Sequence, residues 1–188
     1  MIPRILVVYG TTDGQTRKIA AAMAGALHAD GARVDVVEAR SDARAIAPGQ
    51  YDAVIVAASV HAGSYQRGVR RWVAANVSTL RTVPTAFVSV CLGILEHNPK
   101  TDARLNELID RFLTMTAWQP GVRKIVAGAL LYRKYNWLKR FAMRRIAAKA
   151  GGDVDTSRDH EYTDWEDLKT FAVRFNRDFV MREQRQTG

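Results

Sequence analysis

The sequence predicts an α/β protein in which a parallel sheet is covered on both faces by helices. Short apolar runs, typical of strands buried on both faces, alternate with longer segments whose apolar residues recur at helical spacing. Of the 188 residues 47% are hydrophobic, which is enough to bury one substantial core. Because no linker rich in Pro, Gly or Ser and no internal repeat divides the chain, we expect residues 1–188 to form a single doubly wound domain.

The expected strands and helices alternate along the chain. The first strand is the apolar run from Ile5 to Val8, and the first helix begins at Gln15 and carries Ile19 and Met23 on its apolar side. Further strands are expected at residues 32–39, 51–59, 84–92 and 123–132, and further helices at residues 68–80, 101–115 and 164–181. The last helix is expected to bury Leu168, Phe171, Ala172, Phe175 and Phe179. Five parallel strands favour the order 2-1-3-4-5, which places a ligand beyond the carboxyl ends of the first and third strands.

The stretch between the first strand and the first helix reads GTTDGQT, from Gly10 to Thr16. Such a turn presents unpaired backbone N–H groups and the positive end of a helix dipole, and both favour an anion. Threonine hydroxyls add donors, and Gly10 and Gly14 allow close approach of the backbone. The turn therefore predicts a phosphate site, with an ordinary threonine-capped turn as the alternative. It is neither a P-loop, since no lysine follows Gly14, nor a GxGxxG dinucleotide turn.

This turn resembles the phosphate loop of flavodoxins, a Thr/Ser-x-Thr-Gly-x-Thr run after the first strand. Thr11, Thr12, Gly14 and Thr16 fall on that pattern. The resemblance implies a flavodoxin-like doubly wound sheet of order 2-1-3-4-5, with FMN as the cofactor and its phosphate held by this loop. The residues that it assigns to the cofactor here are Thr11, Thr12, Asp13, Gly14, Gln15 and Thr16.

The loops after the third and fourth strands are expected at the same ligand-binding edge. The first reads SVHAGSYQRG, in which His61 and Tyr65 are candidates to stack on a flavin ring, the alternative being an ordinary start of a helix. The second reads GILEHNPKTD and lacks the aromatic residue that flavodoxins often place over the ring. In these loops the predicted cofactor contacts are Ser59, Val60, His61, Ala62, Gly63, Tyr65, Cys91, Leu92 and Gly93.

A basic segment, about residues 132–160, is inserted before the last helix, and no acidic residue occurs between Asp110 and Asp153. A basic, aromatic and amphipathic segment is typical of a helix that lies on an anionic membrane surface. Nucleic-acid binding, for which no motif is present, and a core-packed helix with a solvated basic face are the alternatives. The net charge of +9 and the pI near 10.0 favour phospholipid or carboxylate partners over the partners of acidic shuttle flavodoxins. The basic residues are Arg133, Lys134, Lys139, Arg140, Arg144, Arg145 and Lys149.

The insertion also carries a more specific resemblance. The runs YGTTDGQTRKIA, ASVHAGSY, PTAFVSV, AGALLYRKYNWLKRFAMRRIAAKAGGDVDT and EYTDW are similar to the corresponding regions of the flavodoxin-like, menaquinone-dependent protoporphyrinogen IX dehydrogenases of bacteria. Membership of that family implies FMN, a membrane quinone as electron acceptor, and oxidation of protoporphyrinogen IX to protoporphyrin IX in haem biosynthesis. Together with the basic insertion it predicts peripheral contact with the inner face of the cell membrane. The alternative is a flavodoxin-like electron-transfer or binding module without a substrate of its own.

Other sequence features narrow the expected site. No signal peptide or membrane-spanning run is recognisable, so we expect a cytoplasmic protein. Cys91 is the single cysteine and is expected to be a small core residue. The acidic run GGDVDTSRDHE lacks the glycine and the glutamate of a calcium loop, so a turn is expected there and no metal site. No side chain stands out as a general base, and no catalytic residue is assigned.

Overall fold

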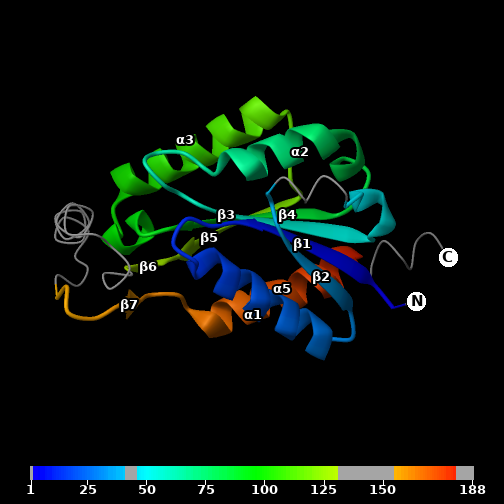
Figure 1. Cartoon of the computed structure of the whole chain (residues 1–188), viewed down its shortest axis with the longest axis horizontal. Helices are drawn as coiled ribbons and strands as arrows, with labels where there is room; N and C mark the ends of the chain where they lie inside the picture. Colours follow the sequence, from blue (N-terminus) through cyan, green and yellow to red (C-terminus); the bar gives the residue numbers. More distant parts are fainter. Residues whose placement is uncertain (1, 41–45, 131–154, 181–188) are drawn as a thin grey trace.

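The computed structural model describes residues 2–40, 46–130 and 155–180. Its main sheet is parallel, and its five strands lie in the order β2-β1-β3-β4-β5. This order, with helices on both faces of the sheet, confirms the predicted fold class (Figure 1). The strands are β1 (Arg4–Gly10), β2 (Arg33–Glu38), β3 (Ala53–Ser59), β4 (Thr85–Cys91) and β5 (Val122–Ala127). The helices are α1 (Gln15–Ala29), α2 (Arg67–Leu80), α3 (Pro99–Thr116) and α5 (Trp165–Phe175), with the short turns η2 (Pro48–Gln50), η3 (Gly93–Glu96) and η5 (Asn176–Val180).

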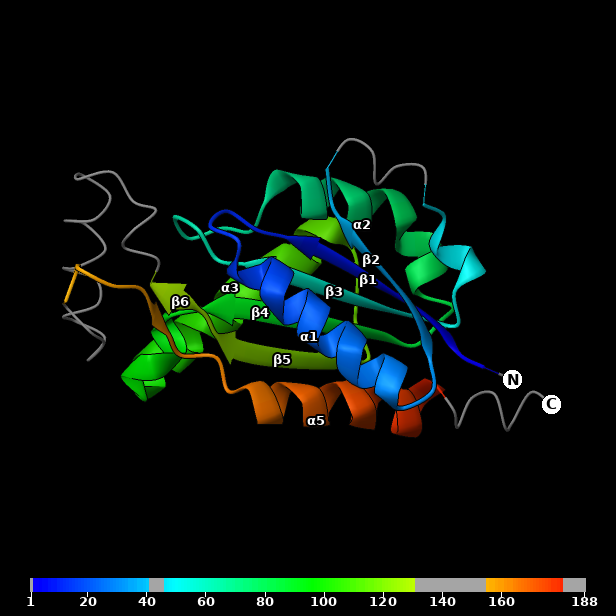
Figure 2. The same ribbon diagram turned by 60° about the horizontal axis from the view of Figure 1, so that its bottom comes forward.

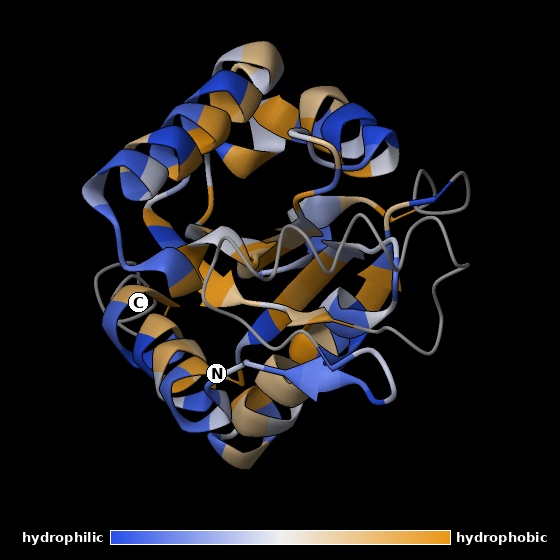
Figure 3. Cartoon of the chain, turned by 90° about the vertical axis from the view of Figure 1, so that its left-hand side faces the viewer, coloured by the Kyte–Doolittle hydropathy of each residue, from blue (hydrophilic) through white to orange (hydrophobic). Residues whose placement is uncertain are grey.

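The helices cover the sheet in two layers, with α1 and α5 on one face and α2 and α3 on the other (Figure 1). Because side chains alternate along a strand, β1 sends Ile5 and Val7 toward α1 and α5, and Leu6 and Val8 toward α2 and α3. Figure 3 shows the hydrophobic residues of the strands lying between the two layers of helices. The central strands are buried on both faces, as their continuous apolar runs predict.

Three loops meet at the carboxyl edge of the sheet. Because β1 pairs with β3 and β3 pairs with β4 in parallel, the loops that follow these strands leave the sheet side by side. These loops are residues 11–14, 60–66 and 92–98. Figure 1 and Figure 2 both place the short strand β6 (Ala129–Leu130) at this same end of the molecule.

The predicted fifth strand, residues 123–132, is wrong in its second half. β5 ends at Ala127, and β6 belongs to a separate antiparallel pair with β7 (His160–Glu161). The change of partner occurs at Gly128, whose N–H still donates to Cys91 O at 3.1 Å while its carbonyl accepts from the N–H of Tyr162 at 3.1 Å. A single apolar run therefore contains two strands, because its second part pairs with a segment about 30 residues away rather than with the sheet.

The last helix differs from its prediction in its C-terminal turn. α5 ends at Phe175 and continues into the π-helical turn η5, whose wider turn changes which side chains face the core. The predicted apolar stripe holds as far as Phe175. Beyond it Phe179 is 43% exposed, and Asn176 and Val180 are buried instead.

The basic side chains from Arg133 to Lys149 lie outside the described residues, so the expectations for this segment stay predictions. The extent of the domain, residues 1–188, stays a prediction for the same reason. Among the described helices, none is both long enough and apolar enough to cross a membrane.

Candidate functional site

The turn after β1 is closed by one of its own side chains. The backbone N–H of Gly14 donates to Thr11 Oγ1 at 2.8 Å, and Gly14 has a φ of 102°, which glycine adopts without strain. No acidic residue belongs to the first turn of α1 itself. The predicted phosphate loop is thus a strand, a tight turn and a helix N-terminus suited to an anion.

Thr16, in the first turn of α1, is fully buried, and its Oγ1 has no hydrogen-bond partner among the described residues. Gln15 is buried next to it in the sequence. Its Nε2 donates to Glu161 Oε1 at 2.6 Å and to Thr163 Oγ1 at 3.0 Å, while its Oε1 also lacks a partner there. An unpaired buried polar atom costs about 1 to 3 kcal/mol and is rare. The orphaned Thr16 hydroxyl at a helix N-terminus therefore fits a bound acceptor such as phosphate.

The loop after β3 turns back on itself at four exposed residues. His61 and Ser64 exchange two backbone hydrogen bonds, at 2.8 and 3.1 Å, across a turn whose central residues, Ala62 and Gly63, have φ values of 48° and 72°. A positive φ is ordinary for glycine but costs alanine free energy, and such strain is often found in ligand-binding loops. The turn leaves the His61 side chain exposed at the carboxyl edge of the sheet, where it can reach a ligand.

Tyr65, the second predicted stacking residue, lies in the core instead. Its ring is 8% exposed and meets Phe87 and Phe112 edge-on, with ring centroids 5.2 and 5.1 Å away. Its hydroxyl shares a 2.7 Å hydrogen bond with Ser89 Oγ, and burial raises the pKa of Tyr65 well above its ordinary value. This ring is therefore not presented to a ligand in the structure, because aromatic neighbours from β4 and α3 enclose it.

Gln66, the residue before α2, is not among the residues that the sequence predicts for the site. Its Nε2 donates to Ser59 Oγ at 2.7 Å and to Thr12 Oγ1 at 3.1 Å. One side chain therefore connects the end of β3 with the turn after β1. Its place at the end of the polar loop, directly before a helix, was the only sequence signal.

Cys91, the last residue of β4 before the third loop, is buried as predicted. Burial raises the pKa of its thiol to about 11, although backbone N–H groups of Ile94 and Gly93 hydrogen-bond to the sulfur and partly oppose the shift. The thiol is therefore protonated at neutral pH, and it is not an activated nucleophile. The remaining predicted contacts, Asp13, Ser59, Val60, Leu92 and Gly93, are half-buried in the three loops, and Thr12 is exposed.

The comparisons with known proteins agree with this geometry. A sequence model of the Flavodoxin domain family matches residues 6–157. The protoporphyrinogen IX dehydrogenase (quinone) of Escherichia coli (strain K12) is 34% identical over 171 residues, which cover 90% of this chain and 92% of the relative. The protein of the same name from Leishmania major is 33% identical over 175 residues, covering 92% and 74%. This chain belongs to the flavodoxin-domain protoporphyrinogen IX dehydrogenase family.

Solved structures share the fold of this family member at low sequence identity. A short-chain flavodoxin associated with a bacterial microcompartment has a TM-score of 0.58 and 16% identity, covering 95% of this chain and 99% of the flavodoxin. The oxidised Flavodoxin 1 of Bacillus cereus has a TM-score of 0.55 and 13% identity, covering 93% and 97%.

In this protoporphyrinogen IX dehydrogenase family member, the two cations that follow the turn after β1 interact with protein groups. Arg17 donates to Tyr9 Oη at 3.0 Å and pairs with Glu38 at 3.3 Å, and Lys18 pairs with Glu161 at 3.3 Å. The turn after β1 therefore offers backbone and hydroxyl donors, while these exposed cations form ion pairs between α1 and the strands β2 and β7.

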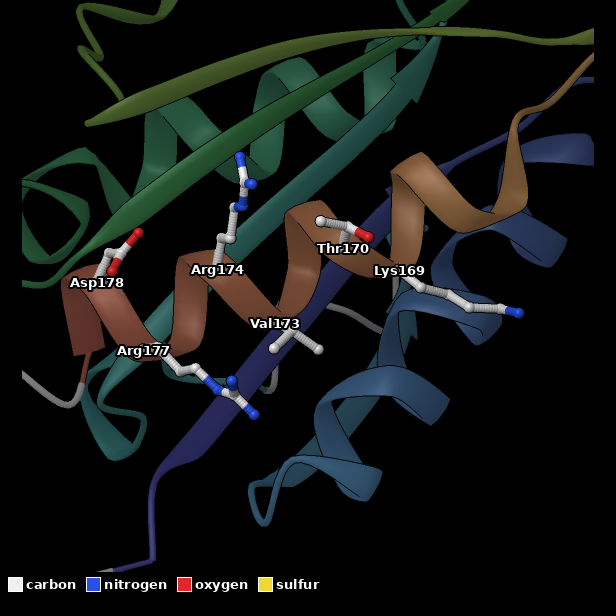
Figure 4. Close-up of a pocket in the computed structure, with 6 residues that line it drawn as sticks. All are labelled: Lys169, Thr170, Val173, Arg174, Arg177 and Asp178. Carbon is white, nitrogen blue, oxygen red and sulfur yellow. The ribbon is translucent and has the colours of Figure 1, made fainter.

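A depression of about 360 Å³ on the outer side of α5 is not part of this site (Figure 4). The depression belongs to the face of a covering helix, whereas ligands of doubly wound sheets bind beyond the carboxyl ends of the strands. In a dehydrogenase of this family we therefore place the candidate site at the three loops. The depression is lined by Lys169, Thr170, Val173, Arg174, Arg177 and Asp178.

Proposed function

We propose that this chain binds FMN and oxidises protoporphyrinogen IX to protoporphyrin IX, with a quinone as electron acceptor. The observation that carries the proposal is the identity of 34% to the Escherichia coli enzyme across 90% of this chain. The orphaned hydroxyl of Thr16, at the N-terminus of α1, supports it independently, because it fits a phosphate group at the place where FMN carries one.

The turn after β1 holds the phosphate in this proposal. The backbone N–H groups of residues 12–16 and the hydroxyls of Thr12 and Thr16 are the donors, and the dipole of α1 favours the anion. Residues 59–63 and 91–93 contact the rest of the cofactor, with His61 available to stack on the ring. When bound, FMN supplies the redox chemistry between substrate and quinone. Cys91 stays protonated and contributes an uncharged wall.

Anaerobic turnover tests this function. Purified protein loaded with FMN is mixed with protoporphyrinogen IX and a soluble quinone, and the fluorescence of protoporphyrin IX is followed. We expect formation of the porphyrin to require both FMN and quinone, and to be unaffected by Thr114→Ala, an exposed position on α3. A protein that binds FMN but forms no porphyrin would instead be an electron-transfer module.

We further propose that the acceptor is a membrane quinone such as menaquinone, met at an anionic membrane surface. The support comes from the sequence of residues 132–152, where seven basic side chains stand without one acidic neighbour among aromatic residues. Each lysine or arginine near an anionic surface contributes about 1 kcal/mol, and salt weakens this attraction. The same surface suits a largely apolar substrate with two carboxylates.

Charge reversal tests the membrane contact. We expect Lys139→Glu, Arg140→Glu and Arg144→Glu together to abolish sedimentation with anionic liposomes at low salt, and to slow turnover with a membrane quinone more than with a soluble one. A matched control reverses three exposed arginines elsewhere, Arg33, Arg104 and Arg111, with the same change in net charge. If the insertion variant sediments as well as the wild type, the proposed membrane contact is wrong. If the control variant loses as much sedimentation as the insertion variant, the attraction depends on net charge and not on residues 132–152.

A further inference from the structure

Gln66 lies over the end of β1, where the missing side chain of Gly10 leaves room for Val69 and for Gln66. A Cβ atom added at Gly10 would lie 3.0 Å from Gln66 Oε1 and 3.3 Å from Gln66 Cβ. From this position the Gln66 amide donates to Ser59 Oγ and to Thr12 Oγ1, at 2.7 and 3.1 Å. The glycine that begins the phosphate loop thus makes space for a protein side chain.

The two hydrogen bonds determine where the hydroxyl hydrogens can point. A hydroxyl has one hydrogen to donate and two lone pairs to accept with. Since the oxygen of Thr12 accepts from Gln66, its hydrogen is directed to some other acceptor. Thr11 is in the same situation, because its oxygen accepts from the backbone N–H of Gly14 at 2.8 Å.

An acceptor-only ligand fits this arrangement. The oxygens of an ionised phosphate monoester only accept hydrogen bonds. The hydroxyl oxygens of Thr11 and Thr12 already accept from protein donors, so their hydroxyl hydrogens are available to donate to the phosphate oxygens. Without Gln66 the Thr12 hydroxyl could rotate and give its hydrogen to other groups. Fixing its direction on binding would then cost additional conformational entropy.

We infer that Gln66 is a positioning residue for the phosphate of FMN, which acts by directing the hydroxyl hydrogen of Thr12 toward it. This inference rests on the proposed FMN site. It extends that site to a residue from the loop after β3, which makes no phosphate contact of its own. The hydrogen bond to Thr12 acts on the phosphate, which riboflavin lacks, whereas the hydrogen bond to Ser59 acts on a part of the site that both flavins share. The ratio of FMN affinity to riboflavin affinity therefore measures the effect of Gln66 on the phosphate.

Flavin titrations of the apoprotein, followed by quenching of flavin fluorescence, test the inference. We expect Gln66→Met to lower the ratio of FMN affinity to riboflavin affinity about tenfold, the lower end of the loss for one hydrogen bond to a charged group, because a loss through Ser59 is common to both flavins. Thr12→Val should lower this ratio at least as much. The double variant should have the same ratio of FMN affinity to riboflavin affinity as Thr12→Val alone, because Gln66 acts on the phosphate through the Thr12 hydroxyl.

Three controls show whether a loss of FMN affinity comes from the Gln66–Thr12 hydrogen bond or from a general loss of structure. Gln50→Met makes the same substitution at an exposed residue of η2 and should leave both affinities unchanged. Thr12→Ser keeps the hydroxyl and should retain the preference for FMN. Gln66→Leu replaces Gln66→Met if thermal unfolding shows that the methionine variant is not folded.

Three outcomes would overturn the inference. One is an equal loss of FMN and riboflavin affinity in the Gln66 variant, and another is no loss of either. The third is additivity of the Gln66 and Thr12 effects on the ratio of FMN affinity to riboflavin affinity. If the wild-type protein does not bind FMN, both the proposed function and this inference are wrong. If the wild-type protein prefers FMN to riboflavin and Gln66→Met keeps that preference, only the inference is wrong.

Discussion

At its N-terminal end α1 buries Thr16 with a hydroxyl that has no partner in the described structure, whereas at its C-terminal end Asp30 is bound from two directions. Asp30 accepts hydrogen bonds from Asn176 Nδ2 at 3.0 Å and from Arg177 Nε at 2.9 Å. A carboxylate at the negative end of a helix is unfavourable by itself, and the guanidinium of Arg177 offsets it. The Thr16 hydroxyl thus makes no hydrogen bond among the described residues, whereas the Asp30 carboxylate makes several, although Asn176 Oδ1 beside it also lacks a partner there.

The contrast indicates which end serves the fold and which serves a ligand. The Asp30 cluster connects α1 to η5 and makes its hydrogen bonds within the protein. The Thr16 end gives up stability, because a buried hydroxyl without a partner costs free energy until an acceptor binds. Substitutions at the N-terminal end should therefore change affinity without loss of stability, and substitutions at the C-terminal end should do the reverse.

The largest effect is expected for the double variant Thr12→Ala, Thr16→Ala. Each hydroxyl bonded to a charged phosphate is worth about 1.5 to 3 kcal/mol, so FMN affinity should fall by about a hundredfold or more. The apoprotein should unfold at the same or a slightly higher urea concentration, because an unpaired buried hydroxyl has been removed. Thr114→Ala with Thr170→Ala, at exposed positions, is the matched control. Unchanged FMN affinity would remove the ligand role from this end of α1.

Gly10→Ala should lower the stability of the fold. Its new Cβ would lie 2.3 Å from Val69 Cγ2 on α2, so the helix must shift, at a cost of about 1 to 3 kcal/mol in unfolding free energy. Gly25→Ala is the control. Gly25 lies inside α1 and its added Cβ would meet no atom within 4 Å, so this substitution should raise the unfolding free energy by about 0.5 to 1 kcal/mol. Urea unfolding measures both variants. A neutral Gly10→Ala would contradict the close packing of α2 on β1.

Asp30→Ala should lower the unfolding free energy by about 1 to 2 kcal/mol, since it removes the hydrogen bonds from Asn176 and Arg177. FMN affinity should stay within about twofold of the wild type, because Asp30 lies at the opposite end of α1 from the loop. Urea unfolding and flavin titration of the same sample provide the comparison. A large loss of FMN affinity in this variant would show that the two ends of α1 are not independent.

The smallest effect is a dependence of stability on pH at the same residue. Burial raises the pKa of Asp30, but hydrogen bonds from Arg177 and Asn176 outweigh burial, and the pKa of the folded state lies below its ordinary value of 3.8. A carboxyl with a lowered folded-state pKa stabilises the fold above its unfolded pKa, and this contribution disappears as the pH falls through the folded value. The stability difference between wild type and Asp30→Asn should therefore shrink below about pH 4. Thermal unfolding that gives a constant difference down to pH 2 would rule out this role.

The sequence was sufficient to predict the elements that depend on local pattern. The buried strands, the helix starts and the turn between β1 and α1 follow from apolar runs, periodicity and turn residues, and all of them occur in the structure. The fifth strand was predicted too long because the apolar run continues through Gly128, and only the pairing with residues 160–161 divides it. Phe179 was predicted as buried because a regular helical period was assumed, and the π-turn changes that period.

The candidate site was less predictable where it depends on contacts between loops. Tyr65 stands in a ligand loop by sequence, but its ring packs among aromatic residues of β4 and α3 that lie far away in the chain. Gln66 matters because it bridges two loops, and no local pattern records such a bridge. Asp155 is an intermediate case, since its carboxylate accepts from Ser157 N at 2.9 Å, the local turn bond expected for this acidic run.

The most direct test is a crystal structure of the protein grown with FMN. We predict that the phosphate lies at the turn after β1, within hydrogen-bond distance of Thr16 Oγ1, Thr12 Oγ1 and the backbone N–H groups that begin α1. Thr16 would then have the partner that it lacks among the described residues. FMN bound in the depression on α5, or bound with its phosphate away from residues 11–16, would contradict this assignment of the site.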